Sequence, residues 1–311
     1  MRNTASSLCL FFIVVASGCA AGLDTEGLFH CDQAIEGQFP SPGTPDAFAG
    51  GWIILDLHCP VREPTLSVQP QQGSPWELTT QVVREGLQVR ALPGMPLAPN
   101  ARFIIGFDDS GFDDSWLLST SSLGSPLSYP LLGHSEELLL DQGLLFSPAS
   151  LSQTLIGGIH SVRPVIQFLA EPTASTISGR LGSLLSESNQ QDDSWPTIDR
   201  SFDWQAPYFS FGSLNLRWAL QGWSLVLEQA RISGTTHPVL EGTGAINIEA
   251  LWDTREADSL LGGAAGALCD FDLQQGGQGC IPCADTSQSC LELLLLDVPT
   301  RYWPDELKSF P

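Results

Sequence analysis

The amino-acid sequence predicts an all-β protein with two domains. The first is an N-terminal β-sandwich, and the second is a larger antiparallel β-sandwich or barrel with one short helix and a disulfide-rich end. Short runs that alternate apolar and polar residues, bounded by glycine and proline, recur along the chain. Hydrophobic residues make up 42% and charged residues 15%, which favours globular cores over disorder. At roughly 100–200 residues per domain, 311 residues predict two domains.

The N-terminus has the order of a secretory signal. Arg2 precedes an apolar run that starts at Leu8, and the small residues 16–18 follow directly before Cys19. The run is too short to span a membrane. Small residues that end on a cysteine resemble the lipobox of bacterial lipoproteins, with Ala16 where leucine is usual. The resemblance implies removal of the signal peptide, acylation of Cys19 and membrane anchoring by several acyl chains.

The expected organisation starts with the lipoprotein signal and anchor and continues with a domain, a linker and a second domain. Their boundaries are 1–18 for the signal peptide, 19–23 for the anchor, 24–110 for the N-terminal β-sandwich, 111–127 for the linker, and 128–311 for the β-rich domain with a cysteine-rich C-terminal region.

The chain is strongly acidic, with 35 acidic against 13 basic residues and a formal net charge of −22. Such a surface repels nucleic acid and anionic lipid head groups, and no basic cluster offsets it. We therefore expect no nucleic-acid partner. An acidic surface is typical of a solvated, exported β-protein, while weak divalent-cation binding and salt adaptation are the alternatives.

The chain has eight cysteines. Cys9 is removed with the signal peptide and Cys19 is the proposed lipid site, so six are left to form disulfides. An even number in an exported chain predicts three disulfides. Cys31 and Cys59 are the only cysteines near the start, so we expect them to pair. The other four lie near the end and allow three pairings, which the sequence does not distinguish: Cys269, Cys280, Cys283 and Cys290.

The first domain is expected to consist of short strands and turns. Strands are predicted at 52–57, 86–92 and 101–107, with Leu87, Val89 and Ala91 of the second one on a single face. Several short strands with a cysteine pair favour a sandwich of about 100 residues.

Residues 87–107, LQVRALPGMPLAPNARFIIGF, resemble the closing strands of bacterial immunoglobulin-like domains of the S-layer-associated type. Those domains share a strand, a proline-rich bridge and a final strand that contains an aromatic residue. The resemblance covers about 20 residues well and the preceding 60 loosely. It implies a spacer or adhesive scaffold module without an active site.

The segment after this domain is acidic and rich in glycine and serine, which predicts a linker over 111–127. Phe-Asp-Asp-Ser occurs twice here, at 107–110 just before the predicted linker and at 112–115 within it. The paired aspartates could supply oxygen ligands to calcium, but they lack the order of acids found in an EF-hand loop. A solvated linker is the favoured interpretation.

The second domain shows the same short, alternating segments. Leu214, Leu216, Trp218 and Leu220 alternate with polar or small residues, which predicts a half-buried antiparallel sheet. A polar loop is predicted over 186–203. The predicted strands of this domain are 138–140, 144–146, 165–169, 176–181, 214–220, 224–232, 244–250 and 291–298.

One helix is predicted from Asp253, because Glu256 follows at the spacing of a capping box. Glycines at 262, 263 and 266 weaken this helix. The cysteines behind it have the spacing C-x10-C-x2-C-x6-C, which zinc could exploit, yet export favours disulfides. This segment resembles the cysteine-rich ends of large, uncharacterised lipoproteins of myxobacterial-type bacteria, and that resemblance implies no activity.

Aromatic residues gather between 195 and 252, where core packing is the favoured interpretation. Trp195, Tyr208 and Trp223 are predicted in loops or at strand ends, so they are the candidate ligand contacts. We expect no cofactor and no metal.

No sequence signature of a nucleophile with its base appears in a suitable context, so we predict a protein that is not an enzyme. The sequence favours a non-catalytic binding or scaffold role in the bacterial cell envelope. Its expected partners are the membrane, through the lipid anchor, and another envelope protein or glycan. Ala20 and Ala21 favour the outer membrane over the inner. The alternatives are a carrier of a lipid-like apolar ligand in the second domain and a secreted glycan hydrolase with paired carboxylates.

Overall fold

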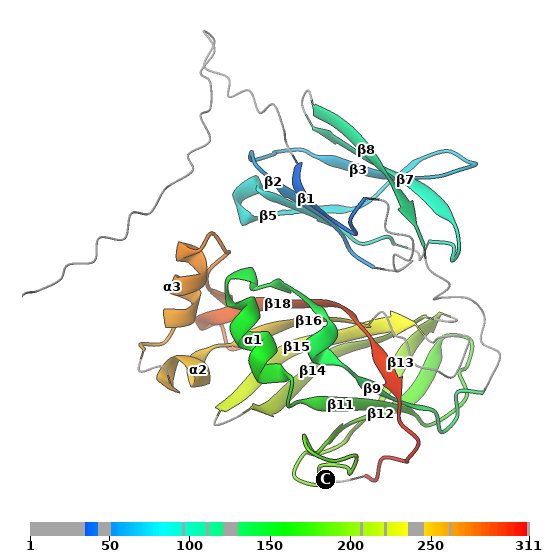
Figure 1. Ribbon diagram of the computed structural model, residues 1–311, viewed down its shortest axis with the longest axis vertical. Coiled ribbons are helices and arrows are strands. Elements are labelled where there is room, and N and C mark those ends of the chain that lie inside the picture. Colours follow the sequence, from blue (N-terminus) through cyan, green and yellow to red (C-terminus); the bar gives the residue numbers. More distant parts are fainter. Residues whose placement is uncertain are drawn as a thin grey trace, which may run out of the picture.

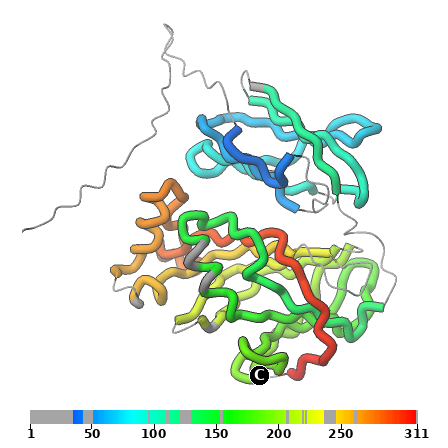
Figure 2. The backbone as a smooth tube through the Cα atoms, in the orientation of Figure 1, coloured from blue at the N-terminus to red at the C-terminus, as the bar shows by residue number. Residues whose placement is uncertain are grey.

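The protein consists of two β-rich bodies, which Figure 1 shows in blue to cyan-green and in green to red. Strands dominate both, so the predicted all-β class is confirmed. The backbone tube in Figure 2 shows the same division. The computed structural model describes residues 35–42, 51–94, 97–109, 112–120, 130–205, 208–220, 223–235, 246–260 and 263–309.

The predicted signal peptide, Cys19 and Cys31 lie outside the described residues. Cys59 is disulfide-bonded. Its predicted partner, Cys31, is not among the described residues, so this pairing stays a prediction. Within the described stretches, no helix is long and apolar enough to cross a membrane.

The first domain is a sandwich of two antiparallel four-stranded sheets. Their strand orders are β1-β2-β6-β5 and β4-β3-β7-β8. The first order corresponds to the ABED sheet of the immunoglobulin fold, and β3-β7-β8 corresponds to its CFG sheet, with the short β4 added beside β3, so the predicted immunoglobulin-like sandwich is confirmed. The strands are β1 Ile35–Phe39, β2 Ile53–Leu57, β3 Thr65–Pro70, β4 Trp76–Glu77, β5 Thr80–Val83, β6 Gln88–Ala91, β7 Arg102–Asp109 and β8 Phe112–Ser119.

Alternating side chains from both sheets fill the core of the first domain. Val89 and Ala91 of β6 both enter it, as predicted, because side chains two residues apart share a face. Gln88 and Arg90 point the other way and are nevertheless buried, since the second domain covers that face. The opposite sheet supplies Leu66, Val68, Phe103, Ile105, Phe107, Trp116 and Leu118.

Strand β8 corrects the predicted domain boundary at residue 110. Residues 112–119, expected in the linker, form a strand that pairs with β7 and places Asp108 opposite Asp113. Trp116 and Leu118 alternate into the core, and their burial outweighs the polar composition that predicted a linker. The final strand is therefore β8 and not β7. Residues 121–127 of the predicted linker lie outside the described residues.

The second domain is built on one antiparallel sheet that curls like a half-barrel. Its strand order is β10-β18-β16-β15-β14-β13-β12-β11-β9-β19, with the short β17 beside β18. The strands are β9 Ser135–Leu138, β10 Leu144–Ser147, β11 Arg163–Phe168, β12 Thr176–Leu184, β13 Ile198–Gln205, β14 Tyr208–Leu220, β15 Trp223–Thr235, β16 Ile246–Asp253, β17 Ile281–Pro282, β18 Gln288–Val298 and β19 Thr300–Tyr302.

Two pairs of consecutive strands tie the ends of the curled sheet together. β10 pairs with β18, while β9 pairs with β19, and only Pro299 separates β18 from β19. The Leu139 N–H also donates to the Pro299 carbonyl at 2.9 Å, between the two ladders. The sheet therefore leaves few backbone groups unpaired at its ends.

The concave side of the sheet holds the core of the second domain. Leu214, Leu216, Trp218 and Leu220 of β14 are all buried there, which confirms the predicted alternation. Helix α1 (Ser152–Ile159), which the sequence did not predict, packs Leu155 and Ile159 into the same core. An aromatic cluster completes it: Phe168, Phe202, Phe209 and Phe211.

The predicted helix after Asp253 is split in two. Helix α2 (Arg255–Leu260) is followed by α3 (Ala267–Gln274), which starts after Gly266 at a φ of 89°. The predicted capping box is wrong, because Glu256 accepts hydrogen bonds from Ser224 N–H and Arg217 and not from Asp253 N–H. The predicted polar loop is also shorter than expected, since residues 198–203 belong to β13.

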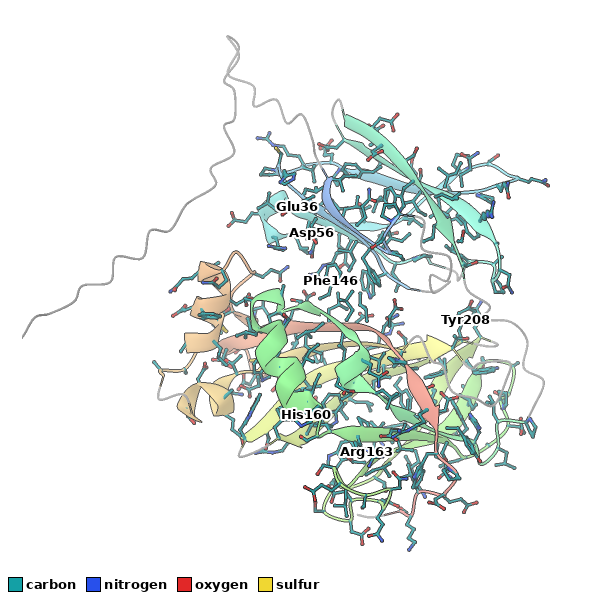
Figure 3. All side chains as sticks on the ribbon, in the orientation of Figure 1. Glu36, Asp56, Phe146, His160, Arg163 and Tyr208 are labelled. Carbon is teal, nitrogen blue, oxygen red and sulfur yellow. A yellow bond between two sulfur atoms is a disulfide. The ribbon has the colours of Figure 1, made fainter. Side chains whose placement is uncertain are left out.

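The two domains pack against each other through the outer faces of β2 and β18. Ile54 and Leu296 are fully buried in this interface, and Trp52 and Leu294 are nearly so. Phe146 of β10 reaches toward the first domain (Figure 3), and its ring lies 5.7 Å from the ring of Phe39, edge to face.

Polar contacts also cross the interface. Arg90 Nη1 of β6 lies 2.6 Å from Glu292 Oε2 of β18, and the Trp52 indole N–H donates to Glu249 Oε1 at 3.2 Å. Arg84 Nη2 donates to the Gly276 carbonyl behind α3 at 2.9 Å. These contacts fix the position of the first domain on the second.

Candidate functional site

The strongest candidate site is a gap in the curled sheet between β13 and β14. These strands pair only from Asp203 to Gln205, opposite Tyr208 to Ser210. Beyond Ser210, β14 continues for ten residues, and among the described residues its ladder partner there is β15 alone. Ser213 in this stretch has a φ of 48°, and the register of β14 against β15 shifts there, so β14 bends away from β13.

A cavity of about 600 Å³, here called the wall cleft, occupies this gap. It lies between the C-terminal half of β14 and the loop 185–197 that leads from β12 into β13. Its wall is mixed, with apolar side chains from the core and hydroxyl groups from the loop. The lining residues that the argument uses are Ser186, Asp192, Trp195, Asn215, Arg217 and Trp218.

Trp195, one of the three predicted ligand contacts, lies at the wall cleft. Its indole N–H donates to the Arg217 carbonyl of β14 at 2.9 Å, and its ring packs against the core. A side chain thus satisfies a backbone acceptor that a neighbouring strand would normally satisfy. Trp195 is therefore both part of the lining and a partial cover of the exposed edge.

The loop that carries Trp195 is held from both sides. Arg163 of β11 donates to the carbonyls of Leu185 and Ser188, and its position in the second domain is labelled in Figure 3. Gln191 exchanges two hydrogen bonds with the backbone of Lys308, at 2.7 and 2.8 Å. These contacts place Trp195 over the cleft without a strand.

Trp218 lines the wall cleft from β14 and was predicted only as a core residue. It is 2% exposed, and its buried indole N–H has no hydrogen-bond partner among the described residues. An unpaired buried N–H costs free energy, which a ligand with an acceptor group could recover. No sequence signal separates this residue from other inward-facing side chains of β14.

The charged groups at the wall cleft already have partners, an ion pair for Arg217 and hydrogen bonds from neutral groups for Asp192. Arg217 Nη2 lies 2.7 Å from Glu256 Oε2, and Asp192 Oδ1 accepts hydrogen bonds from the N–H and hydroxyl of Ser194. Asp192 is the one carboxylate among the described lining residues, and no histidine is among them. The cleft therefore presents a mainly uncharged surface to a ligand.

The other two predicted contacts lie elsewhere. Tyr208 lines a separate cavity of about 330 Å³ with Leu92 and Pro93 of the first domain, where the domains approach each other (Figure 3). Burial raises the pKa of its hydroxyl above 10.0. Trp223 packs on Trp252, with ring centroids 6.0 Å apart, and is not among the residues that line the wall cleft.

A buried pair, His134 and Glu136, lies where β9 meets β19. His134 Nε2 is 2.9 Å from Glu136 Oε1, and the Thr300 hydroxyl donates to Glu136 Oε2 at 2.7 Å. The His134 ring stacks on Tyr302. This pair joins the two strands that close the sheet, which accounts for its geometry without a reaction.

The cysteine-rich end forms two disulfides, Cys269–Cys280 and Cys283–Cys290. The structure thus selects one of the three pairings that the sequence left open. In the described residues, the one group with the spacing of a metal site combines Glu228 with Cys283 and Cys290. Those two sulfurs are bonded to each other, so they offer no thiolates to a metal.

A scan against protein-family models and searches of curated proteins and of solved structures find no match to this chain.

Proposed function

We propose that the protein is a non-catalytic binding protein of the bacterial cell envelope. In this proposal acylated Cys19 anchors it, with the outer membrane favoured, and the immunoglobulin-like domain acts as a spacer. The second domain binds a ligand from the envelope, either another protein or a glycan. The observation that carries the proposal is the wall cleft of about 600 Å³, which exposes part of a domain core to the outside.

Two features support the envelope setting. Both cysteine pairs of the C-terminal end form disulfides, which is typical of chains that leave the reducing cytosol. The first domain packs on the second through a buried, hydrogen-bonded interface, so a tether at the N-terminus would hold the second domain through the first.

The chemistry of the cleft supports binding without catalysis. Asp192, the one carboxylate of the described lining, is engaged by Ser194, and glycoside cleavage needs two carboxyl groups across the scissile bond. Arg217 is neutralised by Glu256. These groups are in place to shape a surface and not to transfer a proton.

A second candidate function is a carrier of an apolar, lipid-like ligand. The observation that favours it is Trp218, a buried aromatic side chain of the core that lines the cleft. Such a ligand would bury apolar surface at about 25 cal/mol per Å².

Native mass spectrometry of the full-length protein from its own membranes tests the proposed function. We expect a non-covalent ligand on the native protein and its loss on denaturation. The Ser186→Trp variant fills the mouth of the cleft and should lose the ligand, whereas Ser178→Trp, on the exposed face of β12 outside the cleft, should keep it. A bare native mass for the unaltered protein would contradict the proposal, and a lipid as ligand would favour the carrier.

A further inference from the structure

The edge of β14 that faces the wall cleft lacks a partner strand. Trp195 donates to the Arg217 carbonyl from the cleft side, so the backbone groups of Arg217 point away from β15. In a regular antiparallel ladder this orientation repeats at every second residue, and β14 pairs with β15 without a register shift from Leu216 to Leu220, so the backbone groups of Ala219 point the same way. Among the described residues, the β13 ladder ends at Ser210 and reaches neither of them.

Only one class of ligand matches such an edge along its length. An extended polypeptide offers donors and acceptors in alternation at the strand repeat of about 3.3 Å. An acyl chain would cover the same N–H and C=O groups without hydrogen bonds, which is costly. A sugar could satisfy single groups but does not repeat the alternation.

The net charge of the protein further limits which extended polypeptides could bind. The chain carries 35 acidic and 13 basic residues, so an acidic segment would be repelled on approach. Arg217, the one basic residue of the described lining, is already paired with Glu256 and offers little compensation. The favoured segment is therefore uncharged or basic, with apolar side chains at alternate positions for the Trp218 side of the cleft.

We propose that the wall cleft binds an extended, uncharged or basic peptide segment of a partner protein, which adds to β14 as a further strand. This inference rests on the proposed binding function and names its ligand class. Addition of a strand to a free sheet edge draws affinity from backbone hydrogen bonds and specificity from alternate side chains. The Trp195 indole, which now occupies the Arg217 carbonyl, would yield that acceptor or share it.

The test uses a fluorescent octapeptide of alternating valine and threonine with one terminal lysine. Its matched control is the same peptide with every second amide N-methylated, which removes the donors of one edge. The full-length protein in detergent, with its disulfides formed, is titrated with both. We expect the methylated peptide to bind about tenfold more weakly or worse, because backbone hydrogen bonds are lost.

Hydrogen exchange locates the bound peptide. The unmodified peptide should slow exchange at the amides of Arg217 and Ala219 and leave the amides of Leu216 and Trp218, which face β15, unchanged. Ser186→Trp should weaken binding and Ser178→Trp should not.

Equal binding of the two peptides, no binding of either, or protection elsewhere overturns the peptide inference. The native mass measurement separates this failure from that of the proposed function. A lipid or glycan lost from Ser186→Trp would leave the binding function standing without the peptide, whereas bare protein with no peptide binding would remove both.

Discussion

At the scale of single residues, the buried Glu137 and the half-buried Glu249 have pKa values shifted in opposite directions. Glu137 is 2% exposed and receives hydrogen bonds from Arg163 Nε and Arg301 Nη2, each at 2.7 Å. Burial alone would raise its pKa, but the two guanidinium groups outweigh burial and lower the pKa below 4.5. Glu249, at the domain interface, has a raised pKa because burial outweighs its contacts with Arg231 and Trp52. The number of charged and hydrogen-bonding partners, and their distance, decides whether the pKa of such a carboxyl group rises or falls.

Replacing Glu137 should cost much more stability than replacing an exposed acid. Glu137→Gln leaves two arginines without their carboxylate, so we expect a loss on the order of 3 kcal/mol in urea unfolding at pH 7. Asp199→Asn, which breaks the half-exposed pair with Arg180, should cost less than about 1 kcal/mol. Equal costs for the two variants would contradict this assignment.

The lowered pKa of Glu137 also predicts an acid dependence. Its contribution is complete above its ordinary pKa of 4.5 and is lost as the pH falls through the lower pKa of the folded state. Urea midpoints should therefore fall less steeply below pH 4.5 in Glu137→Gln than in the unaltered protein. Parallel curves would show that Glu137 is not the group responsible.

Glu249 predicts the reverse dependence. A carboxyl with a raised pKa binds its proton more tightly in the folded state, so the protein gains stability as the pH falls from that raised pKa toward 4.5. Glu249→Gln should be more stable than the unaltered protein at pH 7, and the difference should shrink as the pH approaches 4.5. A destabilised variant at pH 7 would mean that the carboxylate is better paired than burial and contacts indicate.

At the scale of elements, alternation predicted strands well and composition predicted them poorly. The predicted inward-facing residues of β14 were correct, because burial at every second residue follows from the alternation of apolar and polar residues in the sequence. β8 was missed, since its paired aspartates mask the inward Trp116 and Leu118. The cleft was not predictable, because it depends on where β14 bends at Ser213 and not on any residue type.

The break between α2 and α3 gives a test at this scale. Gly266 has a φ of 89°, a left-handed conformation that strains any residue with a Cβ, although the added methyl itself would meet no close neighbour. We expect Gly266→Ala to cost about 1–2 kcal/mol in chemical unfolding. Gly94→Ala, at an exposed site with open space around it, should change stability by less than about 0.5 kcal/mol. Similar effects at both sites would argue against the backbone explanation.

At the scale of the whole molecule, the two domains behave as one unit only if their interface holds. Chain length and strand spacing predicted two domains but not their contact, since Ile54 and Leu296 look like ordinary core residues of separate sheets. Both are 0% exposed because each covers the other domain. The structure therefore joins the first domain to the second through a buried apolar interface.

Weakening that interface should uncouple the domains. We expect the unaltered protein to unfold in one calorimetric transition and the double variant Ile54→Ala/Leu296→Ala to unfold in two. Val68→Ala, which removes core volume from the first domain alone, should lower stability and keep the single transition. One transition in the double variant would show that contacts outside this apolar patch couple the domains.

The central claim is that the edge of β14 beside the wall cleft has no partner strand among the described residues. Amide hydrogen exchange of the free protein tests this claim most directly. The account predicts fast exchange at Arg217 and Ala219 beside slow exchange at Leu216 and Trp218, an alternation that only a strand paired on one edge produces. Uniformly slow exchange along this part of β14 would show that the amides on this edge are already hydrogen-bonded and would contradict the wall cleft as a binding site.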